Sequence, residues 1–291
     1  MKATFNSFIN AINLPNINTP IQPQIKVDTS VPNDAFVRTK PSMEVYTEKL
    51  NKLFPNNELN EIFDELNKKL GIDIPPKLVF NDIDDKVQGG GYTYKTNTVY
   101  FSLPDLLNND HKIVGIKNGK KETLVDPVIK SPLFIEKKYG EEFVQERKDS
   151  LRHRYDELLV EPLTKEEQRK FVLHKLAHEL IHAQQHMYMR KTFGNKAVIQ
   201  AWTHLNPKNK EQAEQVKQIT EKEFSNSYWA DKPETKREYD LATKQGLMAY
   251  MWLEAAKNYK LPPSPEYRKN ALETDAYNRA YMYIVENYGI Y

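Results

Sequence analysis

The sequence predicts an α+β protein, with an extended N-terminal arm, a small antiparallel or mixed sheet and a mostly helical second half. Aromatic and β-branched residues are concentrated between positions 77 and 125, and these residue types favour strands. Beyond position 163, apolar residues recur at helical spacing in segments that prolines and glycines separate. The 291 residues are enough to bury a sizeable hydrophobic core.

The first 42 residues differ in composition from the rest of the chain. They are rich in Asn, Pro and Thr, and four spaced prolines exclude a long helix. These prolines are Pro15, Pro20, Pro23 and Pro32. We therefore predict an arm over residues 1–42 that binds a protein partner or an assembly, and one domain over residues 43–291. In that domain, residues 43–162 are expected to hold the sheet, and residues 163–291 the helices that carry the functional site.

The strands are predicted from short runs of Val, Tyr, Phe and Thr. Two such runs cover residues 77–81 and 92–103. A β-hairpin is predicted over residues 113–116 and 122–125. Its turn falls at Asn118-Gly119, because both of these residues tolerate the positive φ that two-residue hairpin turns require.

The helices are bounded by caps, prolines and glycines. Two are predicted between the candidate N-cap Ser42 and Gly71, separated at Pro55. Later helices are expected near residues 136–160, 164–190, 208–224, 234–259 and 265–287. The three tryptophans are expected in the core, and they are Trp202, Trp229 and Trp252.

Composition excludes several functional classes. The chain has no cysteine, so disulfides, thiolate metal sites and a cysteine nucleophile are excluded, and any metal must be held by His, Asp or Glu. The 42 basic and 40 acidic residues leave a net charge of +2, without the basic patch of a nucleic-acid-binding protein. No secretory signal or membrane-spanning apolar run is recognisable, so we expect no membrane partner. We expect a cytoplasmic location; the alternatives are a viral particle or export without a classical signal peptide.

The chemistry is predicted to lie in the segment His178-Glu179-Leu180-Ile181-His182. Thr164 and Glu167 form a capping-box pattern that starts a helix ahead of it. Residues four apart lie on one face of a helix, so the two imidazoles can converge on one metal ion. Glu179 is then placed to act as general base toward a metal-activated water. The sequence therefore predicts a catalytic zinc site with His178 and His182 as ligands.

Two more histidines continue this pattern, His174 one turn before and His186 one turn after the pair. A helix rises about 1.5 Å per residue, so the outer two lie roughly 18 Å apart and cannot share one ion. Glu179 selects the middle pair. We expect His174 and His186 to lie behind the ligands or at the surface.

The segment HELIHA resembles the zinc motif of the gluzincins, the metallopeptidase group that includes thermolysin and clostridial neurotoxin light chains. In that group a Glu on a later helix is the third ligand, and the segment around Glu273 (ALETDAY) is similar to its Glu-x-x-Ala-Tyr pattern. The segment at 89–101 also resembles the strand pair whose edge binds an extended substrate. The resemblance thus implies a zincin-like fold and the ligand set His178, His182 and Glu273.

The rival third ligands are carboxylates nearer to His182 in the chain: Glu211, Glu214, Glu221 and Glu223. They lie in a highly charged run that looks solvent-facing. Glu273 instead falls in a helix that Ser264 would cap, that Pro265 would start and that Gly289 would end.

This sequence also departs from the gluzincin pattern. Thermolysin-like enzymes have Asp four residues after the ligand Glu, whereas this chain has Tyr277. No further histidine follows the motif at the spacing of the metzincins, and the lack of cysteine argues against a disulfide-linked toxin light chain. Tyr277 or Tyr281 could donate a hydroxyl to the oxyanion of the transition state, or both could simply pack. Tyr277 is the predicted donor.

Taken together, these features predict a zinc-dependent metalloendopeptidase that cuts an extended peptide or protein. The alternative is a structural or assembly protein, such as a component of a viral particle, that keeps a zincin-like fold. A toxin-like effector peptidase would differ only in substrate and delivery.

Overall fold

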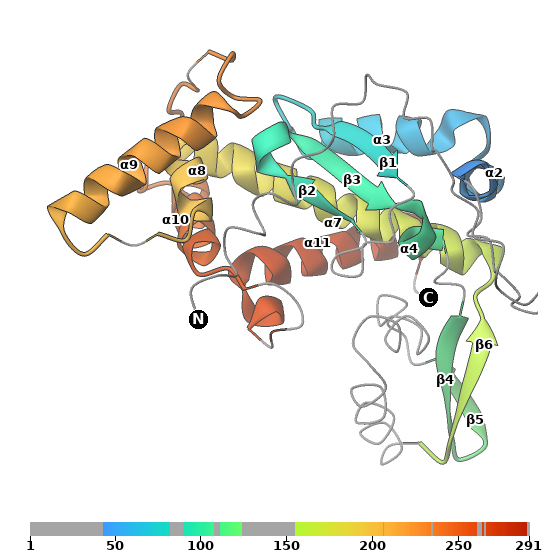
Figure 1. Ribbon diagram of the computed structural model, residues 1–291. Coiled ribbons are helices and arrows are strands. Elements are labelled where there is room, and N and C mark those ends of the chain that lie inside the picture. Colours follow the sequence, from blue (N-terminus) through green and yellow to red (C-terminus); the bar gives the residue numbers. More distant parts are fainter. Residues whose placement is uncertain are drawn as a thin grey trace, which may run out of the picture. The chain divides into compact units, whose positions relative to one another are not determined.

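The structure is a computed structural model, shown in Figure 1, which describes most of the chain beyond the expected arm. The described residues are 43–81, 90–107, 111–123, 155–205, 207–233, 235–260, 264 and 266–289. The chain divides between residues 40 and 41, and all of the described residues belong to the second unit, residues 41–291. The arm predicted over residues 1–42, the candidate cap Ser42 and most of the helix expected near 136–160 lie outside the described residues.

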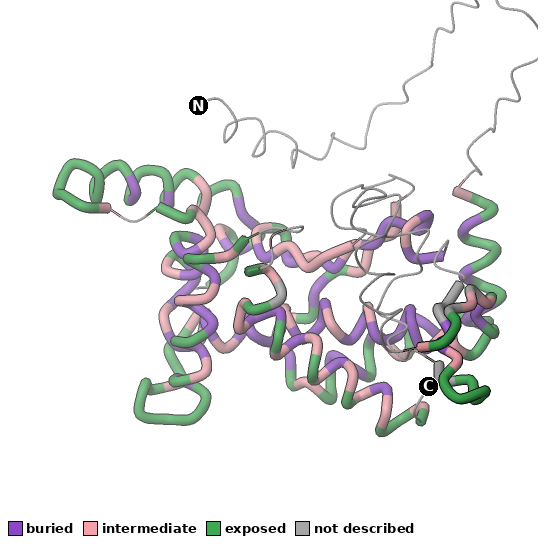
Figure 2. The backbone as a smooth tube through the Cα atoms, turned by 90° about the horizontal axis from the view of Figure 1, so that it is seen from below, coloured by how far each residue is buried: buried purple, intermediate pink, exposed green. Residues whose placement is uncertain are grey.

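The central element is helix α7, Lys165–Phe193, whose 29 residues pass through the domain. Its first turn is closed by the predicted capping box. The Glu167 backbone N–H donates to Thr164 Oγ1 at 3.2 Å, and the Thr164 N–H donates to Glu167 Oε2 at 2.8 Å. From Lys170 onward the helix is buried along most of its length (Figure 2). It is therefore the element on which most of the hydrophobic core packs.

A mixed three-stranded sheet lies on one side of α7, and helix α11 lies on the other (Figure 1). The strands are β1 (Lys77–Asn81), β2 (Gly90–Thr93) and β3 (Thr98–Ser102), in the order β1-β3-β2. β1 pairs parallel to β3, whereas β2 pairs antiparallel to it. The predicted strands are thus present, with a tight 3-10 turn inside the range expected for the second one.

A second sheet is antiparallel and has the order β5-β4-β6. Its strands are β4 (His111–Lys117), β5 (Lys120–Thr123) and β6 (Glu157–Pro162). The predicted hairpin turn is confirmed, since Asn118 and Gly119 have φ values of 52° and 70°. The helix expected near 136–160 is wrong at its end, where residues 157–160 belong to β6. Pairing with β4 satisfies the backbone groups of that segment, and this long-range partner overrides the local helical pattern.

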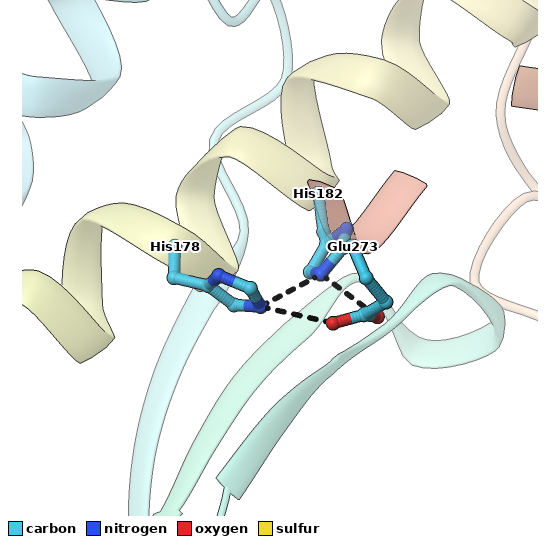
Figure 3. A group of neighbouring side chains, drawn as sticks. All are labelled: His178, His182 and Glu273. Carbon is cyan, nitrogen blue, oxygen red and sulfur yellow. Dashed lines mark hydrogen bonds and ion pairs between the residues drawn. The ribbon is translucent and has the colours of Figure 1, made fainter. Parts of the chain in front are cut away.

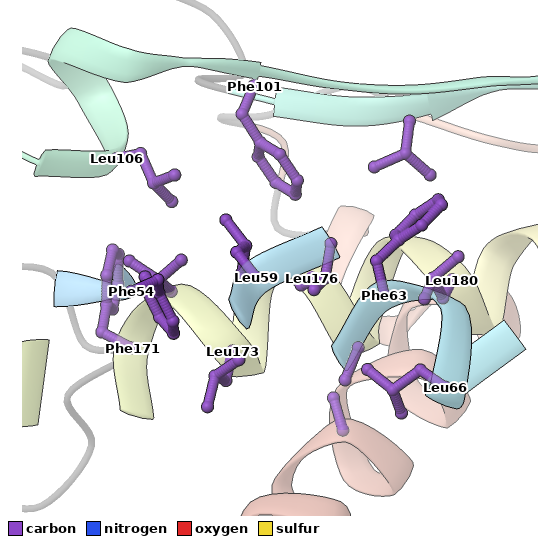
Figure 4. Close-up of a cluster of buried hydrophobic side chains, with 14 of the residues drawn as sticks. Phe54, Leu59, Phe63, Leu66, Phe101, Leu106, Phe171, Leu173, Leu176 and Leu180 are labelled. Carbon is purple, nitrogen blue, oxygen red and sulfur yellow. The ribbon is translucent and has the colours of Figure 1, made fainter. Parts of the chain in front are cut away.

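Two hydrophobic clusters fill the domain. The first surrounds the N-terminal half of α7 and is shown in Figure 4. It combines α7 with helices α2 (Met43–Leu53), α3 (Glu58–Lys69) and α4 (Leu103–Leu107), strand β3 and α11. The second surrounds the C-terminal end of α7 and contains Trp229 and Trp252, which are buried as predicted. Trp202 is only partly buried and packs against this second cluster.

Four helices follow α7: α8 (Asn195–Trp202), α9 (Lys210–Ser225), α10 (Lys244–Lys257) and α11 (Ala271–Tyr288). The last two begin later than predicted, because the effective caps are Thr243 and Asn270. Thr243 Oγ1 accepts from the Gly246 N–H at 3.0 Å, and Asn270 Oδ1 accepts from the Leu272 N–H at 3.0 Å.

Ser264 was therefore the wrong N-cap for the last helix. Its hydroxyl bonds instead to the side chain of Glu266, and residues 267–269 form a separate 3-10 turn. Pro265 lies outside the described residues, and Gly289 ends α11 as predicted. None of the helices in the described part of the chain is long and apolar enough to cross a membrane.

We expect Thr164→Ala to lower the free energy of unfolding by about 1 kcal/mol, because the backbone N–H of Glu167 at the start of α7 loses its acceptor, Thr164 Oγ1. Chemical denaturation followed by circular dichroism measures this change. Thr164→Ser keeps the hydroxyl and serves as the control. Equal losses for the two substitutions would show that the methyl group of the threonine, and not the cap, matters.

Candidate metal centre

Three side chains from two helices converge at one point, as Figure 3 shows. His178 and His182 come from the middle of α7, and Glu273 comes from the first turn of α11. The Nε2 atoms of the two histidines are 3.1 Å apart. Glu273 Oε2 lies 3.4 Å from the Nε2 of His178, and Glu273 Oε1 lies 3.3 Å from the Nε2 of His182. The structure therefore brings together the three residues that the sequence proposed as metal ligands.

These distances fit the donor set of a tetrahedral metal site. Ligand atoms about 2.0–2.2 Å from a tetrahedral ion are separated from one another by about 3.3–3.5 Å. The measured separations are close to these values, although the two histidines face different oxygens of Glu273, and one donor atom from each residue lies within 4.8 Å of the other two. All three side chains are largely shielded, with 12%, 13% and 7% of His178, His182 and Glu273 exposed. A buried group of two imidazoles and one carboxylate can thus hold a metal ion.

Close packing of α11 on α7 places Glu273 against the histidines. Ala276 and Ala280 follow Glu273 on the buried face of α11, and neither has any exposed surface. Their small side chains let the two helix backbones approach closely, while Ile284 fills the core one turn further on. On α7, Leu180 and Ile181 anchor the helix from its other faces. The ligands therefore stand on two rigid elements that pack directly against each other.

The charges within the group are strongly coupled. Burial alone lowers the pKa of His182, but the charge of Glu273 and a hydrogen bond to it raise that pKa to about 9. Burial alone raises the pKa of Glu273, but His182 and His178 hold it well below its usual range. Without a metal ion, a proton is therefore held between His182 and Glu273. A metal ion must displace that proton, because only the deprotonated Nε2 can act as a ligand.

Gln185 orients the ring of His182. The Nδ1–H of His182 donates to Gln185 Oε1 at 2.8 Å. Both protons of the Gln185 amide are already used, one on Asp275 Oδ2 at 2.8 Å and one on the Leu272 carbonyl at 3.1 Å. The amide oxygen must therefore face the histidine, which fixes the proton on Nδ1 and directs Nε2 toward the metal position.

Arg279 continues the hydrogen-bond network of Gln185 and Asp275 away from the site. Its guanidinium donates to Asp275 Oδ2 at 3.3 Å and also to the side-chain oxygen of Gln184. Gln184 in turn donates to the Leu70 carbonyl at the end of α3. The orientation of His182 is thus tied to α11 and α3. The sequence did not reveal Gln185 and Asp275 as functional residues, although Gln185 lies only three residues beyond His182.

Two tyrosines surround the carboxylate of Glu273, and the sequence did not point to either. The phenol of Tyr259 donates to Glu273 Oε1 at 2.5 Å. Tyr267 packs edge-on against the Tyr259 ring, with ring centroids 5.9 Å apart. Burial, and then the charge of Glu273, raise the pKa of the Tyr267 phenol well above its usual value, so the phenol stays protonated. Both lie in the connection between α10 and α11, where the primary structure carries no recognisable signal for a site.

Glu179, the predicted general base, is buried next to His178 and only 8% exposed. Among the described residues its carboxylate forms no hydrogen bond or ion pair. Its negative charge raises the pKa values of His182, Tyr259 and Tyr267, behind larger effects of burial and of Glu273. The carboxylate therefore lies within electrostatic range of His182 and of the two tyrosines, and it is not one of the three convergent donors.

The outer two histidines of the ladder are both buried, so the surface position that we allowed for them is wrong. The His174 ring stacks on that of His178, with ring centroids 6.4 Å apart. His186 lies between the rings of Tyr94 and Trp202, at 4.8 and 5.5 Å. Burial lowers the pKa of both histidines well below the usual value, so both are neutral packing groups.

The other predicted residues lie away from the three donors. The rival carboxylates are on α9, and three of them pair with lysines: Glu221 with Lys196 at 2.8 Å, Glu223 with Lys95 at 2.7 Å and Glu214 with Lys217 at 3.9 Å. Glu211 and Glu214, on the same helix, are exposed. Tyr277 packs edge-on against His174 with centroids 5.4 Å apart, and Tyr281 lies one turn further along α11. The role predicted for Tyr277 stays a prediction.

Comparison with known protein families, with curated proteins and with solved structures finds no match to this chain. What the fold and the site define is an α+β protein with a buried His-His-Glu group that can hold a metal ion. The chemistry of this protein is therefore inferred from the geometry of the His-His-Glu group.

We expect Glu273→Ala to weaken zinc binding by about two orders of magnitude or more, because it removes one of three convergent donors. Isothermal titration calorimetry with zinc measures the affinity. Glu214→Ala, which removes an exposed carboxylate of α9, is the control and should leave the affinity unchanged. The reverse order of the two effects would place the third ligand on α9.

Gln185→Leu should weaken zinc binding about 10- to 100-fold while all three ligands remain, because His182 loses its orienting partner and Asp275 loses a donor. The same substitution at the exposed Gln200 of α8 controls for the change of residue type. Competition with a chromophoric chelator gives both affinities. An unchanged affinity in the Gln185 variant would mean that packing alone orients the histidine.

Proposed function

We propose that this protein is a zinc-dependent metalloendopeptidase of the zincin type. The observation that carries the proposal is the meeting of His178 and His182 with a carboxylate from a separate helix, while Glu179 stays outside the ligand group. A structural site would use all of its charged residues to close the coordination sphere. Here the Glu179 carboxylate forms no hydrogen bond or ion pair among the described residues and lies next to the ligand group, and hydrolysis needs such a base.

Zinc is the proposed metal because the donor set suits it. Two neutral imidazoles and one carboxylate, arranged on a tetrahedral face, are typical of catalytic zinc in peptidases. The chain has no cysteine that could complete a structural zinc site. Gln185 supplies the hydrogen bond that metal-bound histidines generally donate from their second nitrogen.

When bound, zinc supplies a Lewis acid that lowers the pKa of a water molecule and polarises a substrate carbonyl. Glu179 would serve as the base that takes a proton from the attacking water, and it would return that proton to the departing amine. Tyr259 holds Glu273 Oε1 in a hydrogen bond, which leaves Oε2 as the oxygen available to the ion. The transition-state donor proposed from the sequence is the phenol of Tyr277.

An extended peptide is the proposed substrate, bound along strand β2. Among the described strands β2 pairs only with β3, so its other edge has unused backbone donors and acceptors. The strand also lies next to α7, and Tyr92 contacts His186 one turn beyond His182. A peptide added to this edge would form main-chain hydrogen bonds with little preference for sequence.

Glu179→Gln should retain zinc at full stoichiometry and lower the rate of peptide hydrolysis by about a thousandfold or more, because it removes the base and leaves the ligands. Zinc content is measured by atomic absorption, and hydrolysis with a peptide library. Glu166→Gln, an exposed substitution in the first turn of the same helix, is the matched control.

Two outcomes would contradict the proposal. Hydrolysis by Glu179→Gln at the rate of the natural chain would exclude this residue as the base. Stoichiometric zinc in the natural chain without cleavage of any library peptide would favour the alternative, a structural or assembly protein that keeps a zincin-like fold.

A further inference from the structure

Helix α10 is apolar on all of its faces. Between Gly246 and Ala256 the only charged residue is Glu254. One face packs inward on α7 and α8 through Ala249, Trp252 and Leu253, all of which are buried. A surface helix normally confines its apolar residues to such an inward stripe, and a helix that is apolar all round is normally covered on every side. The composition of α10 therefore indicates that its outer face also has a partner.

That outer face is exposed in the domain. Leu247 and Met251 are 55% and 54% exposed, and Tyr250 beside them is 46% exposed. Leu241, just before the N-cap of the helix, is 53% exposed. These four account for a large share of the exposed large apolar side chains in the described part of the chain. A concentration of this kind marks an interaction surface more often than single exposed residues do.

The outer face also has the spacing of a helix-pairing seam. Lys244, Leu247, Met251, Glu254 and Asn258 follow one another at alternating intervals of three and four residues. The two large apolar side chains occupy the middle of the seam. A lysine stands at its N-terminal end and a glutamate at its C-terminal end. The charges are therefore placed symmetrically about the apolar centre, with opposite signs.

We propose that this face binds the same face of a second copy of the chain, with the two α10 helices antiparallel about a twofold axis. In that arrangement Leu247 of each copy meets Met251 of the other. Lys244 of each copy then meets Glu254 of the other, so both ends of the seam carry opposite charges. A parallel pairing would set lysine against lysine and glutamate against glutamate, which is unfavourable.

The two charged residues are available for this contact. Lys244 forms no ion pair among the described residues. Glu254 binds Lys257 of its own helix at 2.6 Å through Oε1, which leaves Oε2 for a second cation. The antiparallel arrangement also aligns the helix dipoles favourably. One helix face buries less surface than a permanent dimer interface, so the expected dissociation constant is about 10 µM.

Sedimentation velocity of the full-length protein from about 1 to about 200 µM tests the proposal, since this range spans the expected dissociation constant. The natural chain should pass from monomer to dimer. Leu247→Glu and Met251→Glu should each keep it monomeric throughout, with an unchanged circular dichroism spectrum, because they place a charge in the apolar centre of the seam. Ile219→Glu, at another exposed apolar residue on α9, is the control and should dimerise like the natural chain.

A charge exchange tests the antiparallel register. Lys244→Glu and Glu254→Lys should each weaken dimerisation at least about tenfold, because each creates two like-charge contacts per dimer. Mixing the two variants should restore it, since in the mixed dimer both contacts again join opposite charges. The double variant, with both substitutions in one chain, should also dimerise.

A natural chain that is monomeric at every concentration would overturn the proposal. Dimers that survive both Leu247→Glu and Met251→Glu would place the interface elsewhere. Failure of the mixed variants to associate would exclude the antiparallel register.

Discussion

The contact between α7 and α11 is the interaction on which the rest of the structure depends. It buries the small face of Ala276 and Ala280 against the helix that carries both histidines, and it brings the Glu273 carboxylate to within 3.4 Å of each imidazole that it faces. The mixed sheet and the N-terminal helices pack on the remaining sides of α7 and hold it in place. Neither helix alone could form the site.

The ligands are held by a second layer of polar contacts, and this layer is made of neutral groups. An amide orients His182, and a phenol holds one oxygen of Glu273. The carboxylate of Asp275 and the guanidinium of Arg279 stand one step further away. Neutral partners donate less charge to the ligands than carboxylates would, so an ion held by these ligands would keep more of its positive charge. Glu179 is then the nearest uncommitted negative charge.

The sequence was informative wherever a signal was local. The capping box at Thr164, the Asn118-Gly119 turn and the i, i+4 histidine pair each depend on residues within one or two turns, and each is present as expected. Where long-range contacts decide, local patterns failed. The end of a predicted helix pairs with β4 instead. The start of α11 was also misplaced, although its cap is local: Asn270, and not Ser264, accepts the N–H of Leu272. Gln185, Tyr259 and Tyr267 became recognisable only when folding placed them beside the ligands.

The three donors of the site come together in a definite order as the chain folds. Two of its donors are present as soon as a single turn of α7 forms, whereas the third arrives only when the chain has closed a long loop. The bond from Gln185 to the Leu272 carbonyl joins residues 87 positions apart. Closing such a loop costs chain entropy, so this contact forms after the local helices. An ion that requires all three donors therefore binds only to chains that have completed their fold, and its presence discriminates finished molecules from partly folded ones.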